Sequence, residues 1–184
     1  RTKISCRFST HVVESFLQNE IDFLDGIIAV DLDDDIRTAW DILEFYHKAP
    51  FIYMMHLPHK TSECAIRFWL HEIENLRKKV EEITGIKVTD EKLLNSIKVY
   101  NKTRQLIAKL YEMRKRPQPS LTGTEFLGIT CTAAIMPKEE FNEKLAELMP
   151  YLETRKVGKE NNLRILVSAD FLDDIRYIKV VEDA

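Results

Sequence analysis

Residues 25–58 read DGIIAVDLDDDIRTAWDILEFYHKAPFIYMMHLP, and this stretch decides the fold class. The apolar run at 27–30 is typical of a strand that is buried on both faces. A second apolar run, at 51–55, indicates another strand. Between them, apolar residues recur near helical spacing from 33 to 46, and Pro50 ends that pattern. Strand, helix and strand at this spacing predict a βαβ unit, and therefore a parallel sheet.

The middle of the chain has the period of long helices. Apolar residues recur at helical spacing from residue 61 to 84, and Gly85 stands where a C-terminal cap is expected. A second helix is predicted from Thr89, whose hydroxyl can cap it, to about Arg116. We expect the two helices to pack against each other as a hairpin. The contact would include Trp69, Ile73, Val80, Leu93, Ile97 and Leu106.

The last third begins with the clearest linker, the Pro-Gln-Pro sequence at 117–119. Thr122 and Glu125 have the spacing of a capping box, which predicts a third helix. Pro137 opens a fourth, which we expect to end at Pro150. Residues 163–167 then read LRILV, a predicted strand, and a helix follows from about residue 172.

Together these elements predict an α/β protein with Rossmann-like βαβ units and a parallel sheet. Long helices form its middle segment, and a second α/β unit begins at the C-terminus. We therefore expect residues 1–116 to hold the end of a first α/β domain plus the helical hairpin. Residues 117–184 would hold a helical connection and the start of a second domain.

Composition excludes several other classes of protein. The chain has 184 residues, 45% of them hydrophobic, and a net charge of −3, which gives no reason to expect nucleic acid. Its three cysteines are widely spaced and form no CxxC pair, which favours a reducing compartment, the cytoplasm, over a disulfide scaffold. The apolar runs are too short to span a membrane. Because the sequence begins at Arg1 and ends in an amphipathic pattern, we expect it to be a piece of a longer protein.

Several short motifs, in the same order along nearly the whole chain, resemble those of the 2-hydroxyacyl-CoA dehydratase/benzoyl-CoA reductase family. The order of the motifs carries the resemblance, because none of them is decisive alone. The motifs are CRF at 6–8, EIDFLDGII at 20–28, DDIR at 34–37, LPHKTSE at 57–63, EITG at 82–85, TDE at 89–91, YNKTR at 100–104 and RILVS at 164–168.

The resemblance implies two α/β domains joined by helices, in a subunit that pairs with a second family subunit and holds an iron–sulfur cluster. It implies dehydration of a 2-hydroxyacyl-CoA, a lyase reaction, or reduction of an aromatic acyl-CoA. Both reactions would proceed through ketyl-type radicals in anaerobic metabolism. Electrons would come from a separate ATP-driven iron–sulfur activator. The sequence does not decide which acyl-CoA is used, or whether this piece is itself active.

The resemblance also implies the cluster ligands. Cys6 falls on the first cysteine of the family, although a free cysteine is as often a small buried apolar residue. The position of the second cysteine ligand of the family corresponds to Asp33 in this sequence. A carboxylate is a poor replacement for a thiolate on iron. Asp33 and the two aspartates after it could bind a hard cation, but we favour a role in capping the following helix. The position of the third cysteine ligand of the family would lie beyond Ala184, so we expect any cluster in this piece to be absent or incomplete.

Two histidines, His56 and His59, follow the second predicted strand. Loops at the carboxyl ends of parallel strands often form sites, and histidine can act as an acid or base near neutral pH. A turn histidine with a satisfied hydrogen bond is the favoured interpretation for both. Cys64 and Cys131 are predicted to be packing residues, and no catalytic residue is assigned.

Three functions stay open from the sequence. The first is a catalytic subunit of an iron–sulfur acyl-CoA dehydratase or reductase, which Cys6 favours. The second is a cluster-free structural or pairing subunit of the same family, which Asp33 favours. The third is an ATP-linked double-cluster reductase, because the family has relatives of that kind.

Overall fold

The chain divides into two units, Arg1–Val88 and Thr89–Ala184. The structure is a computed structural model that describes residues 6–46, 51–157, 163–169 and 172–184. Pro50, the predicted helix breaker, lies outside these ranges. The boundary predicted after residue 116 refers to domains rather than to these two units, and it stays a prediction.

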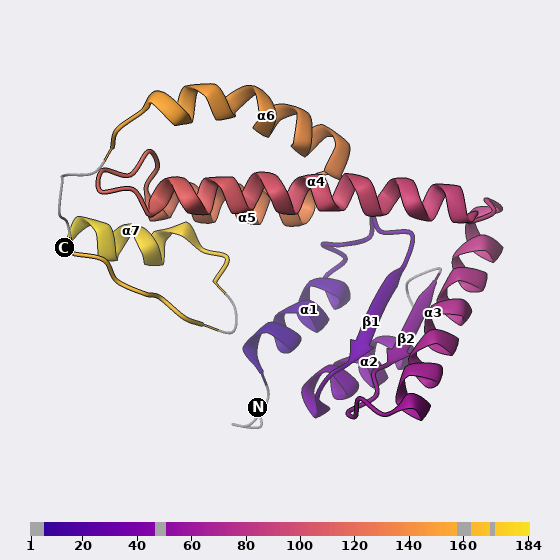
Figure 1. Ribbon diagram of the computed structural model, residues 1–184. Helices are drawn as coiled ribbons and strands as arrows, with labels where there is room; N and C mark the ends of the chain where they lie inside the picture. The colour runs from indigo at the N-terminus through magenta and orange to yellow at the C-terminus, as the bar shows by residue number, and fades with distance from the viewer. Residues whose placement is uncertain (1–5, 47–50, 158–162, 170–171) are drawn as a thin grey trace. The chain divides into compact units, whose positions relative to one another are not determined.

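The first unit is built on two parallel strands (Figure 1). Strand β1 (Ile27–Asp31) pairs with β2 (Ile52–His56) in a register that places Ile27 beside Ile52 and Asp31 beside His56. Helix α2 (Asp34–Tyr46) lies between the strands in sequence and packs against β1. The predicted βαβ unit is therefore confirmed, and with it the α/β class. At its carboxyl end each strand runs one residue further than predicted, to the polar residues Asp31 and His56, and β2 begins at Ile52 rather than at residue 51.

Two more helices complete this unit. Helix α1 (Arg7–Leu17) packs against α2, and α3 (Glu63–Thr84) packs against β2. A small apolar core results, because only a few large side chains are buried among these elements. Its buried members are Phe16, Trp40, Leu43 and Met55.

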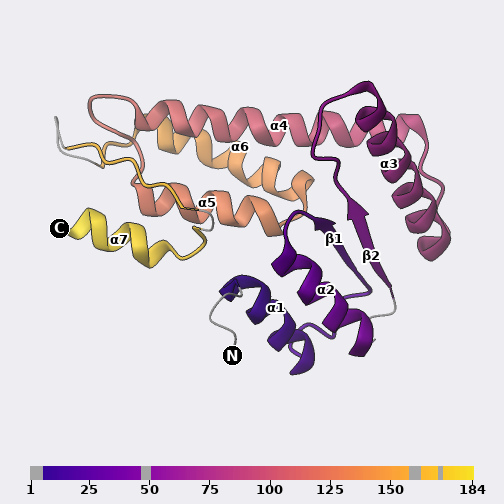
Figure 2. The ribbon, with the colours of Figure 1, turned by 90° about the horizontal axis from the view of Figure 1, so that it is seen from below.

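The second unit is helical in its described residues. Its helices are α4 (Asp90–Arg114), α5 (Gly123–Ile135), α6 (Lys138–Thr154) and α7 (Ile175–Asp183). Helix α4 packs against α6, and α5 packs against α7 (Figure 2). Their apolar faces enclose the larger core of the chain. This core consists of Leu106, Leu110, Met113, Leu121, Ala133, Phe141, Leu145, Met149 and Leu152.

The predicted helix ends are confirmed where a cap fixes them. Gly85 ends α3 with φ 66°, a left-handed conformation that glycine adopts without the clash of a Cβ. The Thr89 hydroxyl accepts a hydrogen bond from the backbone N–H of Lys92 at the start of α4. Thr122 and Glu125 form the complete capping box of α5.

The predicted contact between the two long helices is confirmed only for Leu106, which is buried in the core of the second unit. Trp69 and Val80 are half-buried, whereas Ile73, at 43% exposed, and Leu93 and Ile97 are surface residues within their own units. The packing of α3 against α4 joins the two units and stays a prediction. Two other predictions are wrong. Helix α6 continues through Pro150 to Thr154. Residues 163–167 form no strand, because the described part of their unit supplies only helices and so offers no backbone ladder to join.

Among the described residues, no helix is both long and apolar enough to cross a membrane.

Candidate functional site

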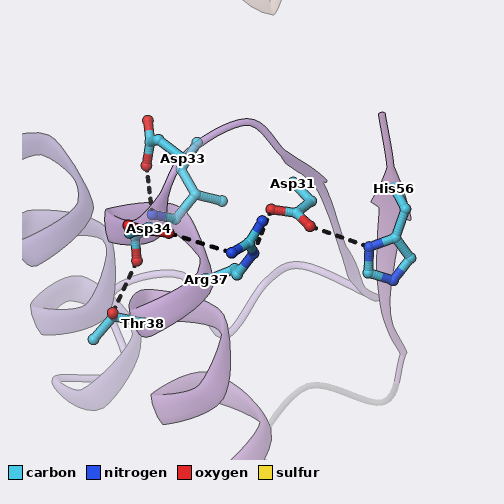
Figure 3. Close-up of polar contacts among 7 residues, drawn as sticks. Asp31, Asp33, Asp34, Arg37, Thr38 and His56 are labelled. Carbon is cyan, nitrogen blue, oxygen red and sulfur yellow. Dashed lines mark hydrogen bonds and ion pairs between the residues drawn. The ribbon is translucent and has the colours of Figure 1, made fainter. Parts of the chain in front are cut away.

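The carboxyl ends of β1 and β2 carry a polar cluster formed by Asp31, Arg37 and His56 (Figure 3). Asp31 ends β1 and His56 ends β2, and the two residues are register partners in the sheet. Arg37 comes from the first turn of α2, directly after the loop that leaves β1. The cluster therefore occupies the edge of a parallel sheet where α/β proteins usually place their sites.

Both carboxylate oxygens of Asp31 are engaged. Its Oδ1 accepts a hydrogen bond from Arg37 Nε at 2.8 Å, and its Oδ2 lies 3.2 Å from His56 Nδ1. Only 9% of the Asp31 surface is exposed, so these two partners replace the water that the carboxylate loses on folding. Arg37 also reaches Asp34, with Nη1 at 3.2 Å from Oδ1.

The charges within the cluster stabilise each other. The hydrogen bond from Arg37 lowers the pKa of Asp31, against the opposing effect of burial, and His56 lowers it further. The same hydrogen bond raises the pKa of Arg37. Asp31 is therefore an anion at neutral pH, and an ionised carboxylate can only accept hydrogen bonds.

A second buried carboxylate, that of Glu72 on α3, holds the backbone of the cluster. Its Oε2 accepts a hydrogen bond from the backbone N–H of His56 at 3.0 Å, and only 8% of Glu72 is exposed. This contact fixes the main chain at the end of β2. The His56 side chain itself is 59% exposed, so its ring remains accessible from solvent.

Cys6 lies at the N-terminal end of α1 and is partly exposed. Its backbone carbonyl accepts hydrogen bonds from Thr10, but its thiol makes no hydrogen bond within the described residues. Cys64 is exposed on the first turn of α3, so its predicted packing role is wrong. Cys131 is partly buried, with Sγ 3.6 Å from the carbonyl of Asp173.

Asp33 acts as a cap of α2. Its Oδ1 accepts a hydrogen bond from the backbone N–H of Ile36 at 2.8 Å, as the favoured interpretation predicted. Figure 3 shows this carboxylate turned toward the helix start rather than toward His56. The structure thus brings Cys6 and Asp33 to the starts of two helices that pack together, without a polar contact between them.

A four-iron cluster is usually held by four cysteine thiolates. This chain has three cysteines in total, and they lie on α1, α3 and α5. Across residues 6–46, 51–157, 163–169 and 172–184, no group of three or more His, Cys, Asp or Glu side chains is placed to hold a metal ion. The side chains in the described part of the chain therefore do not fit a complete cluster site by themselves.

Sequence reasoning considered His56 but missed Asp31, Arg37 and Glu72 as its partners. A signal for Asp31 was present, because an aspartate directly follows a buried apolar run at the carboxyl end of a predicted parallel strand. Glu72 carried no such signal, since it stands in a helix rich in charged residues.

Comparison with known proteins defines the class. Residues 2–183 match the family described as 2-hydroxyglutaryl-CoA dehydratase, D-component, and the chain belongs to this family. It is 24% identical over 180 residues to a subunit of the benzoyl-CoA reductase of Thauera aromatica, a match that covers 96% of this chain and 47% of that protein.

Two other relatives are dehydratase subunits. The chain is 26% identical over 180 residues to the beta subunit of the (R)-2-hydroxyglutaryl-CoA dehydratase of Acidaminococcus fermentans, covering 97% of this chain and 48% of that protein. It is 21% identical over 179 residues to the (R)-phenyllactyl-CoA dehydratase beta subunit of Clostridium sporogenes, again covering 97% and 48%. The chain thus spans about half the length of these relatives.

Proposed function

We propose that this chain is part of a subunit of an iron–sulfur enzyme that acts on an acyl-CoA by radical chemistry. The reaction would be dehydration of a 2-hydroxyacyl-CoA or reduction of an aromatic acyl-CoA. The observation that carries the proposal is the family match, which runs through almost the whole chain. The matching relatives are named as subunits, which supports a second subunit as partner. An ATP-driven iron–sulfur activator and a cytoplasmic location complete the proposal.

Cys6 is the residue that we expect to contribute to a cluster. Its thiol is partly exposed and makes no hydrogen bond in the described structure, so it is available as a ligand. The remaining thiolates would have to come from outside the described residues or from a partner subunit. The cluster would supply single electrons to the reaction, while this chain supplies one ligand.

A second candidate function is a cluster-free pairing subunit of the same family. The hydrogen bond from the Ile36 backbone N–H to the Asp33 carboxylate favours this function. Asp33 stands where the family has its second cysteine ligand, and here it is used as a helix cap, so that position offers no thiolate to a cluster.

Metal analysis of the complete protein that carries this sequence distinguishes the two. We expect about four irons and four labile sulfides per chain after anaerobic purification, and loss of most of the iron in Cys6→Ala. Cys64→Ala is the matched control, since that thiol is exposed on another helix. An iron-loaded wild type with equal iron in Cys6→Ala would exclude Cys6 as a ligand. An iron-free wild type that still binds its partner subunit would favour the pairing role.

A further inference from the structure

The tautomer of His56 follows from the groups around it. Asp31 is ionised and can only accept, so the contact of 3.2 Å between its Oδ2 and His56 Nδ1 is a hydrogen bond only if Nδ1 carries the proton. In the neutral ring the other nitrogen, Nε2, then holds a lone pair. Figure 3 shows this second nitrogen on the side of the ring away from Asp31.

The ring is held on one side and open on the other. The Glu72 carboxylate fixes the backbone N–H of His56, and Asp31 fixes Nδ1. Arg37 in turn holds the opposite oxygen of Asp31, so the carboxylate is clamped between a guanidinium and an imidazole. The His56 side chain is 59% exposed, so much of the ring is accessible from solvent while these partners hold it.

We propose that Asp31, Arg37 and His56 form a proton-transfer site, in which Asp31 orients His56 so that Nε2 exchanges a proton with an oxygen atom of a bound 2-hydroxyacyl-CoA. The identity of this ligand rests on the proposed function, whereas the orientation of the imidazole does not. His56 is the catalytic residue of the site. Asp31 and Arg37 are positioning residues, since they act through the ring.

The proton step is balanced within the site. The Nε2 lone pair takes the proton of the ligand hydroxyl, so an N–H bond forms as the O–H bond breaks. The ring becomes an imidazolium, and the adjacent Asp31 carboxylate stabilises its positive charge. The reverse step returns the proton to the oxygen and restores the neutral ring. No oxidant, reductant or metal is needed for this exchange.

The Asp31→Asn variant gives a sharp test. Its amide can form hydrogen bonds with both Arg37 and His56 in only one orientation. Arg37 Nε–H only donates, so the amide oxygen has to face Arg37, and the amide NH2 then faces His56 Nδ1. Nδ1 must become the acceptor, and the proton of the neutral ring moves to Nε2. Arg37→Gln is the matched variant: it disturbs the same cluster but leaves the carboxylate beside His56, so Nδ1 should keep its proton.

The experiment is nitrogen NMR on the complete protein labelled with 15N-histidine, with the His56 signals assigned by their loss in His56→Gln. At a pH where the ring is neutral, we expect the Nδ1–H form in the wild type and in Arg37→Gln, and the Nε2–H form in Asp31→Asn. Addition of (R)-2-hydroxyglutaryl-CoA should shift the His56 Nε2 signal and leave that of His59 unchanged. An Nε2–H form in the wild type, or the same tautomer in Asp31→Asn, would overturn the orienting role of Asp31.

Turnover by the enzyme assembled with its partner subunit provides the second readout. We expect His56→Gln to lower kcat by about 100-fold or more, the range of general acid–base catalysis, and His59→Gln to stay within about twofold. If the wild type turns over its substrate and His56→Gln does so equally fast, proton transfer by His56 is overturned, even if the tautomer is as expected. If the wild type turns over no 2-hydroxyacyl-CoA and no aromatic acyl-CoA in a panel that includes (R)-2-hydroxyglutaryl-CoA, (R)-phenyllactyl-CoA and benzoyl-CoA, the proposed function fails. In that case, a His56 Nε2 signal that does not shift when (R)-2-hydroxyglutaryl-CoA is added overturns the proposal that this site binds an acyl-CoA. The tautomers measured by NMR then decide separately whether Asp31 orients His56.

Discussion

Asp31 Oδ2 and His56 Nδ1 lie 3.2 Å apart, although 25 positions separate the two residues in sequence. Their contact is a direct consequence of the parallel register, which pairs Asp31 with His56 as the last residues of β1 and β2. A shift of β2 by one residue would turn the His56 side chain to the other face of the sheet, away from Asp31. The polar cluster and the sheet register therefore depend on each other.

This relationship makes the stability of the first unit sensitive to pH. The folded-state pKa of Asp31 lies below its ordinary value of 3.8, chiefly because of the hydrogen bond from Arg37. A depressed carboxyl pKa contributes stability that is present above the unfolded value and is lost as pH falls through the folded value. We expect Asp31→Asn to be less stable than wild type at pH 7, and this difference to shrink below about pH 4.

Urea unfolding at pH 7, 4 and 3 measures this difference. Asp41→Asn is the control, because Asp41 is exposed on α2 and makes no ion pair in the described structure. Its effect on the urea midpoint should be small at every pH. A constant deficit of Asp31→Asn down to pH 3 would contradict the ion pair with Arg37.

Local signals in the sequence predicted the secondary structure well. Gly85, Thr89 and the Thr122–Glu125 capping box act through hydrogen bonds within a few residues, so their effect can be read from adjacent positions. The two strands were found in the same way, from short apolar runs. These features need no knowledge of which segments meet in space.

Features that depend on distant partners were missed or wrong. Ile73 has the helical period of a core residue, yet its exposure depends on what packs against α3. Residues 163–167 have a strand-like composition but lack a neighbouring strand in the described structure. The contacts of Asp31 with His56 and of His56 with Glu72 depend on register and helix placement, which a single sequence does not contain.

The two apolar residues Ile73 and Leu110 should respond very differently to truncation. Leu110 on α4 is fully buried in the core of the second unit, whereas Ile73 on α3 is 43% exposed. We expect Leu110→Ala to cost about 2–5 kcal/mol of unfolding free energy and Ile73→Ala about 1 kcal/mol or less. Urea unfolding followed by circular dichroism measures both free energies. A cost for Ile73→Ala equal to that of Leu110→Ala would show that the Ile73 side chain on α3 is buried in the folded protein.

Two glycines should give effects of opposite sign when replaced by alanine. Gly85 has φ 66°, where a Cβ is strained, although no atom lies within 4 Å of the added carbon. We expect Gly85→Ala to destabilise by about 1 kcal/mol. Gly128 lies inside α5 and its added Cβ would meet only Ile175 at 3.9 Å, so Gly128→Ala should stabilise by about 0.4–1 kcal/mol. Thermal unfolding of the two variants beside the wild type checks both signs.

Glu182 attaches α7 to the start of α5. Its carboxylate accepts hydrogen bonds from the backbone N–H of Gly123, from the N–H of Thr124 at 3.2 Å and from the Thr124 hydroxyl at 2.6 Å. The N-terminal end of a helix carries partial positive charge, so a carboxylate there is favoured over a neutral amide.

We therefore expect Glu182→Gln to weaken this attachment by about 0.3–1 kcal/mol and to speed hydrogen exchange of the α7 amides. Asp183→Asn removes the same charge one residue further along, at an exposed side chain without a hydrogen bond in the described structure, and should leave exchange nearly unchanged. Thr124→Ala should act in the same direction as Glu182→Gln, because it removes the hydroxyl donor. Equal exchange rates in Glu182→Gln and Asp183→Asn would mean that net charge, rather than the contact with α5, holds α7 in place.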